Sequence, residues 1–230
     1  MLDKVILNIK KGSKILYALA VIISALSIVF NILYVYSGLE MPRIFFLGNQ
    51  LFAKGFLSTG IFIVVMFTGA LSTKWFITKP LLRLRGELAI IASIFIIPHM
   101  FESLLFWLVG IYSSQNLLLI LIVGIIAFIV VIPLCLTSFK SIRSKINGKK
   151  WKRIQRWSYV FYFLIYFHIM LAFLFFEPKP NILDCFALTL IFLAYTLLRL
   201  LKYSSDKDKR ERTIKKAQRS VNKSRREMRL

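Results

Sequence analysis

Long uninterrupted apolar segments constrain this chain more than any other feature of its sequence. Six of them, each near the roughly 20 residues that span a bilayer, occupy residues 15–36, 56–71, 87–109, 117–136, 157–176 and 182–201. Their apolar residues run continuously instead of alternating with polar ones, which argues against an outer-membrane β-barrel. Hydrophobic residues make up 58% of the chain, which excludes a soluble enzyme, a secreted disulfide scaffold and a disordered chain. We predict an all-α membrane protein, a six-helix transmembrane bundle.

The basic residues predict the orientation of this bundle. Of the 32 Lys and Arg residues, 28 lie in the N-terminal segment, in the loops after the second and fourth apolar segments, and in the tail. The opposite loops hold only Arg43, Lys54 and Lys179. Because basic loops stay on the cytoplasmic side, we expect both termini to be cytoplasmic. The first apolar segment is too long for a signal-peptide core, so we expect an uncleaved anchor.

The division of the chain follows from the same counts. We expect one membrane domain over residues 1–201 and a basic cytoplasmic tail over residues 202–230, with twelve basic and four acidic side chains in the tail. Such a tail favours contact with anionic lipid, although a tail that is only solvated fits as well, and we do not expect nucleic acid as a partner. The localisation predicted is multi-pass in a cell membrane, and heavy use of Lys, Ile and Phe hints at a bacterial source.

The chain has two histidines, and both fall inside predicted spans. His99 lies twelve residues into the third segment and His168 eleven residues into the fifth, which corresponds to depths of about 18 Å and about 16 Å. Both segments enter from the cytoplasmic side, so the two imidazoles are expected at the same depth. Ionisable side chains in a bilayer are functional candidates, and two facing imidazoles are suited to bind one haem iron from both sides.

Other interpretations of these residues remain open from the sequence alone. Each histidine fits a packing residue that forms a hydrogen bond inside the bundle. A zinc site would need further ligands, and Glu102, three residues after His99 on the same helix face, is the candidate third ligand. Glu102 also suits a proton relay, a packing carboxylate, or a step in a metal-transport pathway together with His99.

A wider pattern surrounds the histidines. Thr137-Ser138 is followed by a basic loop with Gly148, by the run Trp151–Arg156 and by His168, while Pro80-Leu81 and Arg83–Arg85 precede the segment that holds His99. This pattern resembles the ferric-reductase-like transmembrane domain superfamily, and most closely the haem-binding membrane subunit of the protein-methionine-sulfoxide reductase system. The likeness covers residues 59–168 and places a ferric-reductase-like core at about 56–201.

The resemblance implies an integral membrane b-type haem protein in electron transport, with His99 and His168 as the axial iron ligands. One departure concerns a second haem: the position of the family's inner histidine is Gln155, and glutamine is not a usual haem ligand. On the third segment, the positions thirteen and fourteen residues before His99 are Gly86 and Arg85, so no histidine lies there either. The resemblance therefore implies one haem.

We expect a membrane quinol or a bound flavin such as FMN as electron donor, because a single haem in the outer half lies far from the cytosol. The acceptor expected is extracytoplasmic, either a reductase partner or a small oxidant, with Glu102 taking up protons. Arg43, Lys54 and Lys179 are the outer cations available to haem propionates. The alternative is a cofactor-free membrane scaffold or transport component that keeps the fold without the redox role.

Overall fold

The computed structural model describes residues 2–37, 48, 51–110, 115–175 and 182–227, and the regular elements in these ranges are helices. Five of them are long and apolar enough to cross a membrane: α2 (Ser13–Ser37), α5 (Thr78–Leu108), α6 (Gln115–Leu136), α9 (Ser158–Phe175) and α10 (Ile182–Glu227). The remaining predicted segment forms a shorter apolar helix, α4 (Phe56–Ala70). The prediction of an all-α, multi-pass membrane protein is confirmed.

Two helices extend beyond the apolar segments that the sequence marks. Helix α5 begins at Thr78, ahead of residue 87, and α10 continues past residue 201 to Glu227. Pro80 is tolerated in α5 because it lies in the first turn, where backbone N–H groups have no helical partner. Residues 202–227 contain neither Gly nor Pro, and Lys, Arg and Glu are good helix formers, so α10 extends into the tail without a break.

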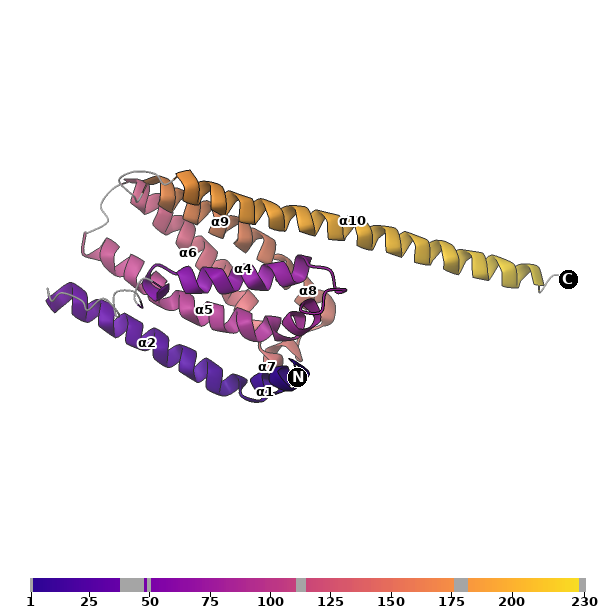
Figure 1. Cartoon of the computed structure of the whole chain (residues 1–230), viewed down its shortest axis with the longest axis horizontal. Coiled ribbons are helices and arrows are strands. Elements are labelled where there is room, and N and C mark those ends of the chain that lie inside the picture. Colours follow the sequence, from indigo (N-terminus) through magenta and orange to yellow (C-terminus); the bar gives the residue numbers. More distant parts are fainter. Residues whose placement is uncertain (1, 38–47, 49–50, 111–114, 176–181, 228–230) are drawn as a thin grey trace.

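Helix α5 is the centre of one half of the bundle. It packs against α4 on one side and α2 on another, while α6 packs against α9. Helix α10 contacts both α4 and α9, and α5 contacts α6, which joins the two halves (Figure 1). A core of buried side chains from α4, α5, α6, α9 and α10 fills the centre, and it includes Phe62, Ala92, Phe161, Tyr162 and Tyr195.

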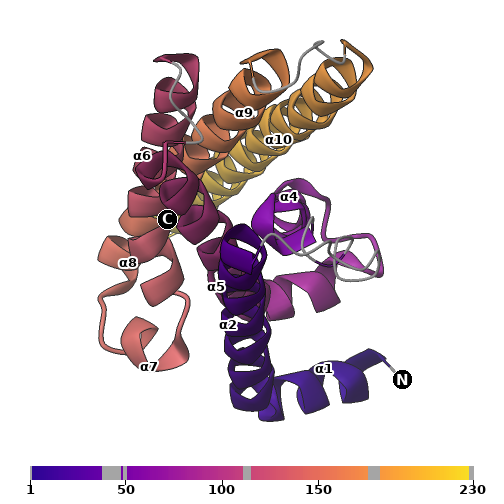
Figure 2. The same cartoon turned by 90° about the vertical axis from the view of Figure 1, so that its left-hand side faces the viewer.

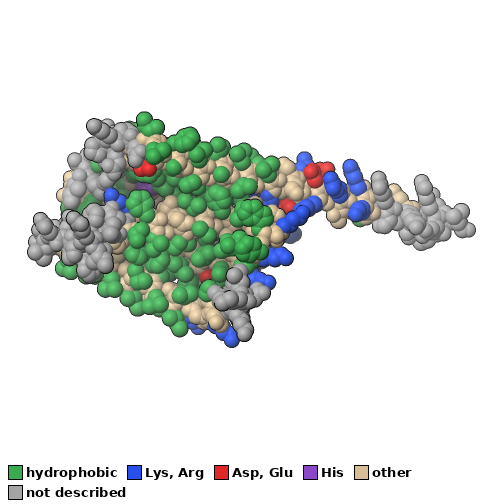
Figure 3. Space-filling view, viewed as in Figure 1, with side chains coloured by type: hydrophobic (Ala, Val, Ile, Leu, Met, Phe, Trp, Pro, Cys, Tyr) green, Lys and Arg blue, Asp and Glu red, His purple; other side chains and the backbone are tan. Residues whose placement is uncertain are grey.

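Both chain termini lie at the same end of the bundle (Figure 1). Helix α1 (Leu2–Lys11) lies across the end of α2 there (Figure 2), with Lys10 and Lys11 in its last turn. Hydrophobic side chains cover the sides of the bundle, and most Lys and Arg side chains in this view gather at this end and along the tail (Figure 3). We call this end the inner end. The segregation of charge agrees with the predicted positive-inside arrangement, and the cytoplasmic location of this end stays a prediction.

The contact between α4 and α5 leaves no room for a larger side chain at Ala92. This residue is 0% exposed, and the Ser58 hydroxyl of α4 donates a hydrogen bond to its carbonyl at 2.8 Å. We expect Ala92→Leu to lower the free energy of unfolding by about 1–3 kcal/mol through overpacking, seen as a lower thermal midpoint in detergent. Ala194→Leu is the matched control, because Ala194 is exposed on α10; equal midpoints for the two variants would contradict the packing described.

Candidate functional site: two histidines at one cavity

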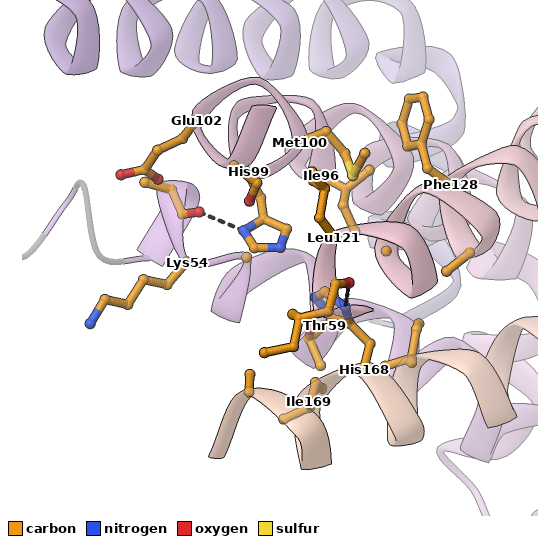
Figure 4. Close-up of a pocket in the computed structure, with 18 of the residues that line it drawn as sticks. Lys54, Thr59, Ile96, His99, Met100, Glu102, Leu121, Phe128, His168 and Ile169 are labelled. Atoms are coloured by element: carbon orange, nitrogen blue, oxygen red, sulfur yellow. Dashed lines mark hydrogen bonds between the residues drawn. The ribbon is translucent and has the colours of Figure 1, made fainter. Parts of the chain in front are cut away.

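A cavity of about 540 Å³ lies among the transmembrane helices. Its size is within the range of small-molecule and cofactor sites. Side chains of α4, α5, α6 and α9 form most of its wall, together with Leu188 of α10. The wall is mainly apolar, and both histidines contribute to it (Figure 4).

His99 reaches the cavity from α5 and is held by the backbone that precedes α4. Its Nδ1 lies 2.7 Å from the carbonyl oxygen of Ala53. A carbonyl oxygen only accepts hydrogen bonds, so Nδ1 carries the ring proton and Nε2 keeps its lone pair. The chain turns into α4 at Gly55, whose φ of 71° lies in the left-handed region that favours glycine,. A Cβ atom at Gly55 would also lie 3.2 Å from Cγ of His99.

His168 reaches the same cavity from α9 and is held by α6. Its Nδ1 lies 3.0 Å from the carbonyl oxygen of Ile120, which again leaves Nε2 unprotonated. Gly124 follows Ile120 by one helical turn, where a side chain would cover this carbonyl. A Cβ atom at Gly124 would lie 3.0 Å from Cε1 and 3.3 Å from Nδ1 of His168. The His168 imidazole therefore fits in this position because Gly124 has no side chain.

The structure brings the two predicted histidines together. Their ring centroids are 5.9 Å apart, and the ring planes are inclined at 77°. The rings approach from different helices on different sides of the cavity (Figure 4). Each ring has its Nδ1 engaged by a backbone carbonyl and its Nε2 available as a ligand atom.

Glu102 and Lys54 line the cavity near His99. The Glu102 carboxylate points away from the imidazoles in Figure 4, and the Lys54 side chain also extends away from them. Among the described residues, no group of three or more His, Cys, Asp or Glu side chains is placed to hold a metal ion, so the zinc interpretation has no third ligand there. Arg43 and Lys179, the other predicted outer cations, lie outside the described residues.

The predicted motif around Thr137 lies outside the cavity lining and connects α6 to α8 (Gly148–Arg156). The Trp151 Nε1 donates to the Thr137 carbonyl at 3.2 Å, and the Gln155 amide donates to the Thr137 hydroxyl at 2.9 Å. The Arg143 guanidinium stacks on the Trp151 ring at 4.2 Å. Gln155 occupies the position that the resemblance assigns to the family's inner histidine. Its hydrogen bond to Thr137 connects α8 to the end of α6.

Part of the chain is similar to a known family of membrane proteins. Residues 54–166 match the family described as ferric reductase like transmembrane component. This range includes His99 and Gln155 and ends two residues before His168. The match supports the ferric-reductase-like superfamily that the sequence resembles.

Two curated proteins are similar to the chain. An uncharacterized protein of Treponema pallidum is 33% identical over 153 residues, which cover 63% of this chain and 42% of that protein. Magnetosome protein MamZ of Magnetospirillum gryphiswaldense is 44% identical over 52 residues, which cover 23% of this chain and 8% of that protein. Neither name refers to methionine-sulfoxide reduction, so that finer resemblance stays a prediction. No solved structure gives a significant match.

Two residues that shape the site, Gly55 and Gly124, are missing from the sequence-based prediction. An isolated glycine inside an apolar helical pattern signals close backbone approach, and Gly124 in the fourth segment carries that signal. The carbonyl groups of Ala53 and Ile120 have no signal of this kind, because every residue has a carbonyl.

Gly124→Ala tests how His168 is positioned. The new Cβ would lie 3.0 Å from the ring, so we expect the imidazole to move and its ring ¹⁵N resonances to shift in the metal-free protein. The chain has only two histidines, so the signals of His99 and His168 can be assigned with single His variants. Gly60→Ala is the matched control, because nothing lies within 4 Å of a Cβ there. Unchanged His168 signals in Gly124→Ala would contradict the close contact.

Proposed function

We propose that the protein is an integral membrane b-type haem protein that moves electrons from a membrane quinol, or from a bound flavin, to an extracytoplasmic acceptor. His99 and His168 would hold a single haem as its axial ligands. The observation that carries this proposal is the approach of the two imidazoles to 5.9 Å across one cavity. When bound, a bis-imidazole haem supplies one-electron transfer and leaves no open iron position for oxygen chemistry.

The donor atoms fit this role. Each imidazole would offer its Nε2 to the iron, and histidine nitrogen is a usual haem ligand. The hydrogen bonds from Nδ1 to Ala53 and Ile120 orient each ring and raise the basicity of its Nε2. The room left by Gly55 and Gly124 lets both rings approach from opposite helices.

The surroundings of the site favour a lipid-soluble donor. Phe56 and Trp107 line the cavity and are also 53% and 41% exposed, so the cavity reaches the outer surface of the bundle beside apolar side chains. A quinol in the bilayer could approach there. Its oxidation releases protons, and Glu102 at the cavity wall is the group that we assign to accept them.

Of the three predicted outer cations, Lys54 is the one that lies among the described residues. We assign it to a haem propionate, since it lines the cavity and carries the required positive charge. An extracytoplasmic reductase partner or a small oxidant would then take the electrons. Contact of the basic tail with anionic lipid, and residence in the cell membrane, belong to the same proposal.

Removal of either imidazole is expected to abolish haem binding. Purified protein reconstituted with haem should show a sharp Soret band, and dithionite should bring out α and β bands. We expect both features to be lost in His99→Ala and His168→Ala, because each variant lacks one axial ligand. Gln155→Ala is the control and should keep them, since the Gln155 amide is bonded to Thr137.

A wild-type protein that stays colourless after haem supplementation would reject the proposal. The remaining interpretation would then be a cofactor-free membrane scaffold. If that colourless protein transported a metal ion, the result would favour a metal-transport pathway through His99 and Glu102.

Glu102→Gln tests the proton role separately from haem binding. We expect the absorption spectrum to stay unchanged while the rate of reduction by duroquinol falls about tenfold or more, because the amide cannot accept the proton. Reduction by dithionite requires no such acceptor and should keep its wild-type rate. Equal duroquinol rates in the variant and the wild type would remove Glu102 from the mechanism.

A further inference from the structure

Three basic side chains gather at the inner end of α4, away from the histidine cavity. Arg199 and Lys202 come from α10, and Arg85 comes from α5. The Arg199 Nη1 donates to the Gly69 carbonyl at 3.0 Å, and the Lys202 Nζ donates to the carbonyls of Gly69 and Leu71 at 2.8 and 3.0 Å. These bonds satisfy carbonyls that have no partner within α4, and cations are favourable at a helix C-terminus.

Arg85 has a different role from this helix cap. Its guanidinium packs against the backbone of Gly69, where a Cβ atom would lie 3.4 Å from Nη1. Within the part of the chain that the structure describes, no hydrogen bond to this guanidinium is found. Its electrostatic neighbours are Tyr195, Tyr159 and Arg199, and the Tyr159 hydroxyl already accepts a hydrogen bond from Arg199 Nε at 2.8 Å.

The cluster of Arg85, Arg199 and Lys202 carries more positive charge than its surroundings balance. Asp206, one turn further along α10, acts on Lys202, and Lys209 adds another positive charge nearby. The C-terminus of α4 contributes about half a negative charge. A partly buried group of like charges is unfavourable unless an anion joins it, and a guanidinium fork matches the oxygens of a phosphate group.

The position of the cluster indicates where this phosphate comes from. The inner end also carries α1 and the exposed side chains of Trp75 and Phe76, which are 61% and 84% exposed. Exposed aromatic residues of this kind are found at the level of lipid headgroups. We propose that Arg85, Arg199 and Lys202 form a binding site for the phosphate of an anionic phospholipid headgroup at the inner membrane surface.

Binding of phosphatidylglycerol is the direct test. The purified full-length protein in detergent would be titrated separately with short-chain phosphatidylglycerol, phosphatidylcholine and inorganic phosphate, with bound species counted by native mass spectrometry. We expect wild-type protein to prefer phosphatidylglycerol. Arg85→Gln should weaken that binding about tenfold, because it removes a charged hydrogen-bond donor, and should leave phosphatidylcholine binding unchanged.

Two further variants keep the test sharp. Lys215→Gln removes an exposed charge about 20 Å further along α10, and should bind phosphatidylglycerol like the wild type. Arg85→Lys keeps the charge but loses the planar fork, so it should bind with intermediate strength. If circular dichroism shows that Arg85→Gln does not fold, the comparison of Arg85→Lys with the wild type decides.

Three results would overturn the proposal. The first is equal binding of phosphatidylglycerol and phosphatidylcholine to the wild type. The second is an equal loss of phosphatidylglycerol affinity in the Arg85 and Lys215 variants. The third is binding of inorganic phosphate that depends on Arg85 while phosphatidylglycerol binding does not, which would assign the site to a soluble phosphate compound.

Discussion

The site depends on one kind of interaction, the hydrogen bond from an imidazole Nδ1 to a backbone carbonyl. His99 forms it with Ala53 and His168 forms it with Ile120. Each bond determines which ring nitrogen carries the proton and how the ring is turned. Because the acceptors are backbone atoms of neighbouring segments, the geometry of the pair is set by how α4 and α6 pack, and the glycines at 55 and 124 are part of that packing.

These two bonds differ from the hydroxyl hydrogen bonds that stay within one membrane-spanning helix. Hydroxyl groups such as Thr68, Thr189 and Thr196 donate to a carbonyl three or four residues earlier in their own helix, which satisfies them at small cost. The histidines instead bond across 46 and 48 residues of sequence to other segments. Like the bond from the Ser58 hydroxyl to the Ala92 carbonyl, they require tertiary structure, whereas the bonds of these threonine hydroxyls require only a helix.

Much of the fold could be predicted from the sequence, because apolar length and the regular rise of a helix are properties of the chain alone. The pairing of His99 with His168 at one depth follows from such counting. The bounds of α4 also agree with the predicted segment 56–71. The early start of α5 at Thr78 and the unbroken α10 do not follow from apolar length, since polar residues can continue a helix, and neither Pro80 in the first turn nor Gly86 ends α5. The sequence showed Thr137, Trp151 and Gln155 only as parts of a motif. The hydrogen bonds from Trp151 and Gln155 to Thr137 could be found only in the structure.

The continuity of α10 has a mechanical consequence. From Lys202 to Glu227 the helix extends about 38 Å beyond the apolar part at 1.5 Å per residue,, and Figure 1 shows it projecting straight out of the bundle. A stiff rod anchored against α4 and α9 behaves as a lever arm. A small tilt at its root would become a displacement of several ångströms at its tip.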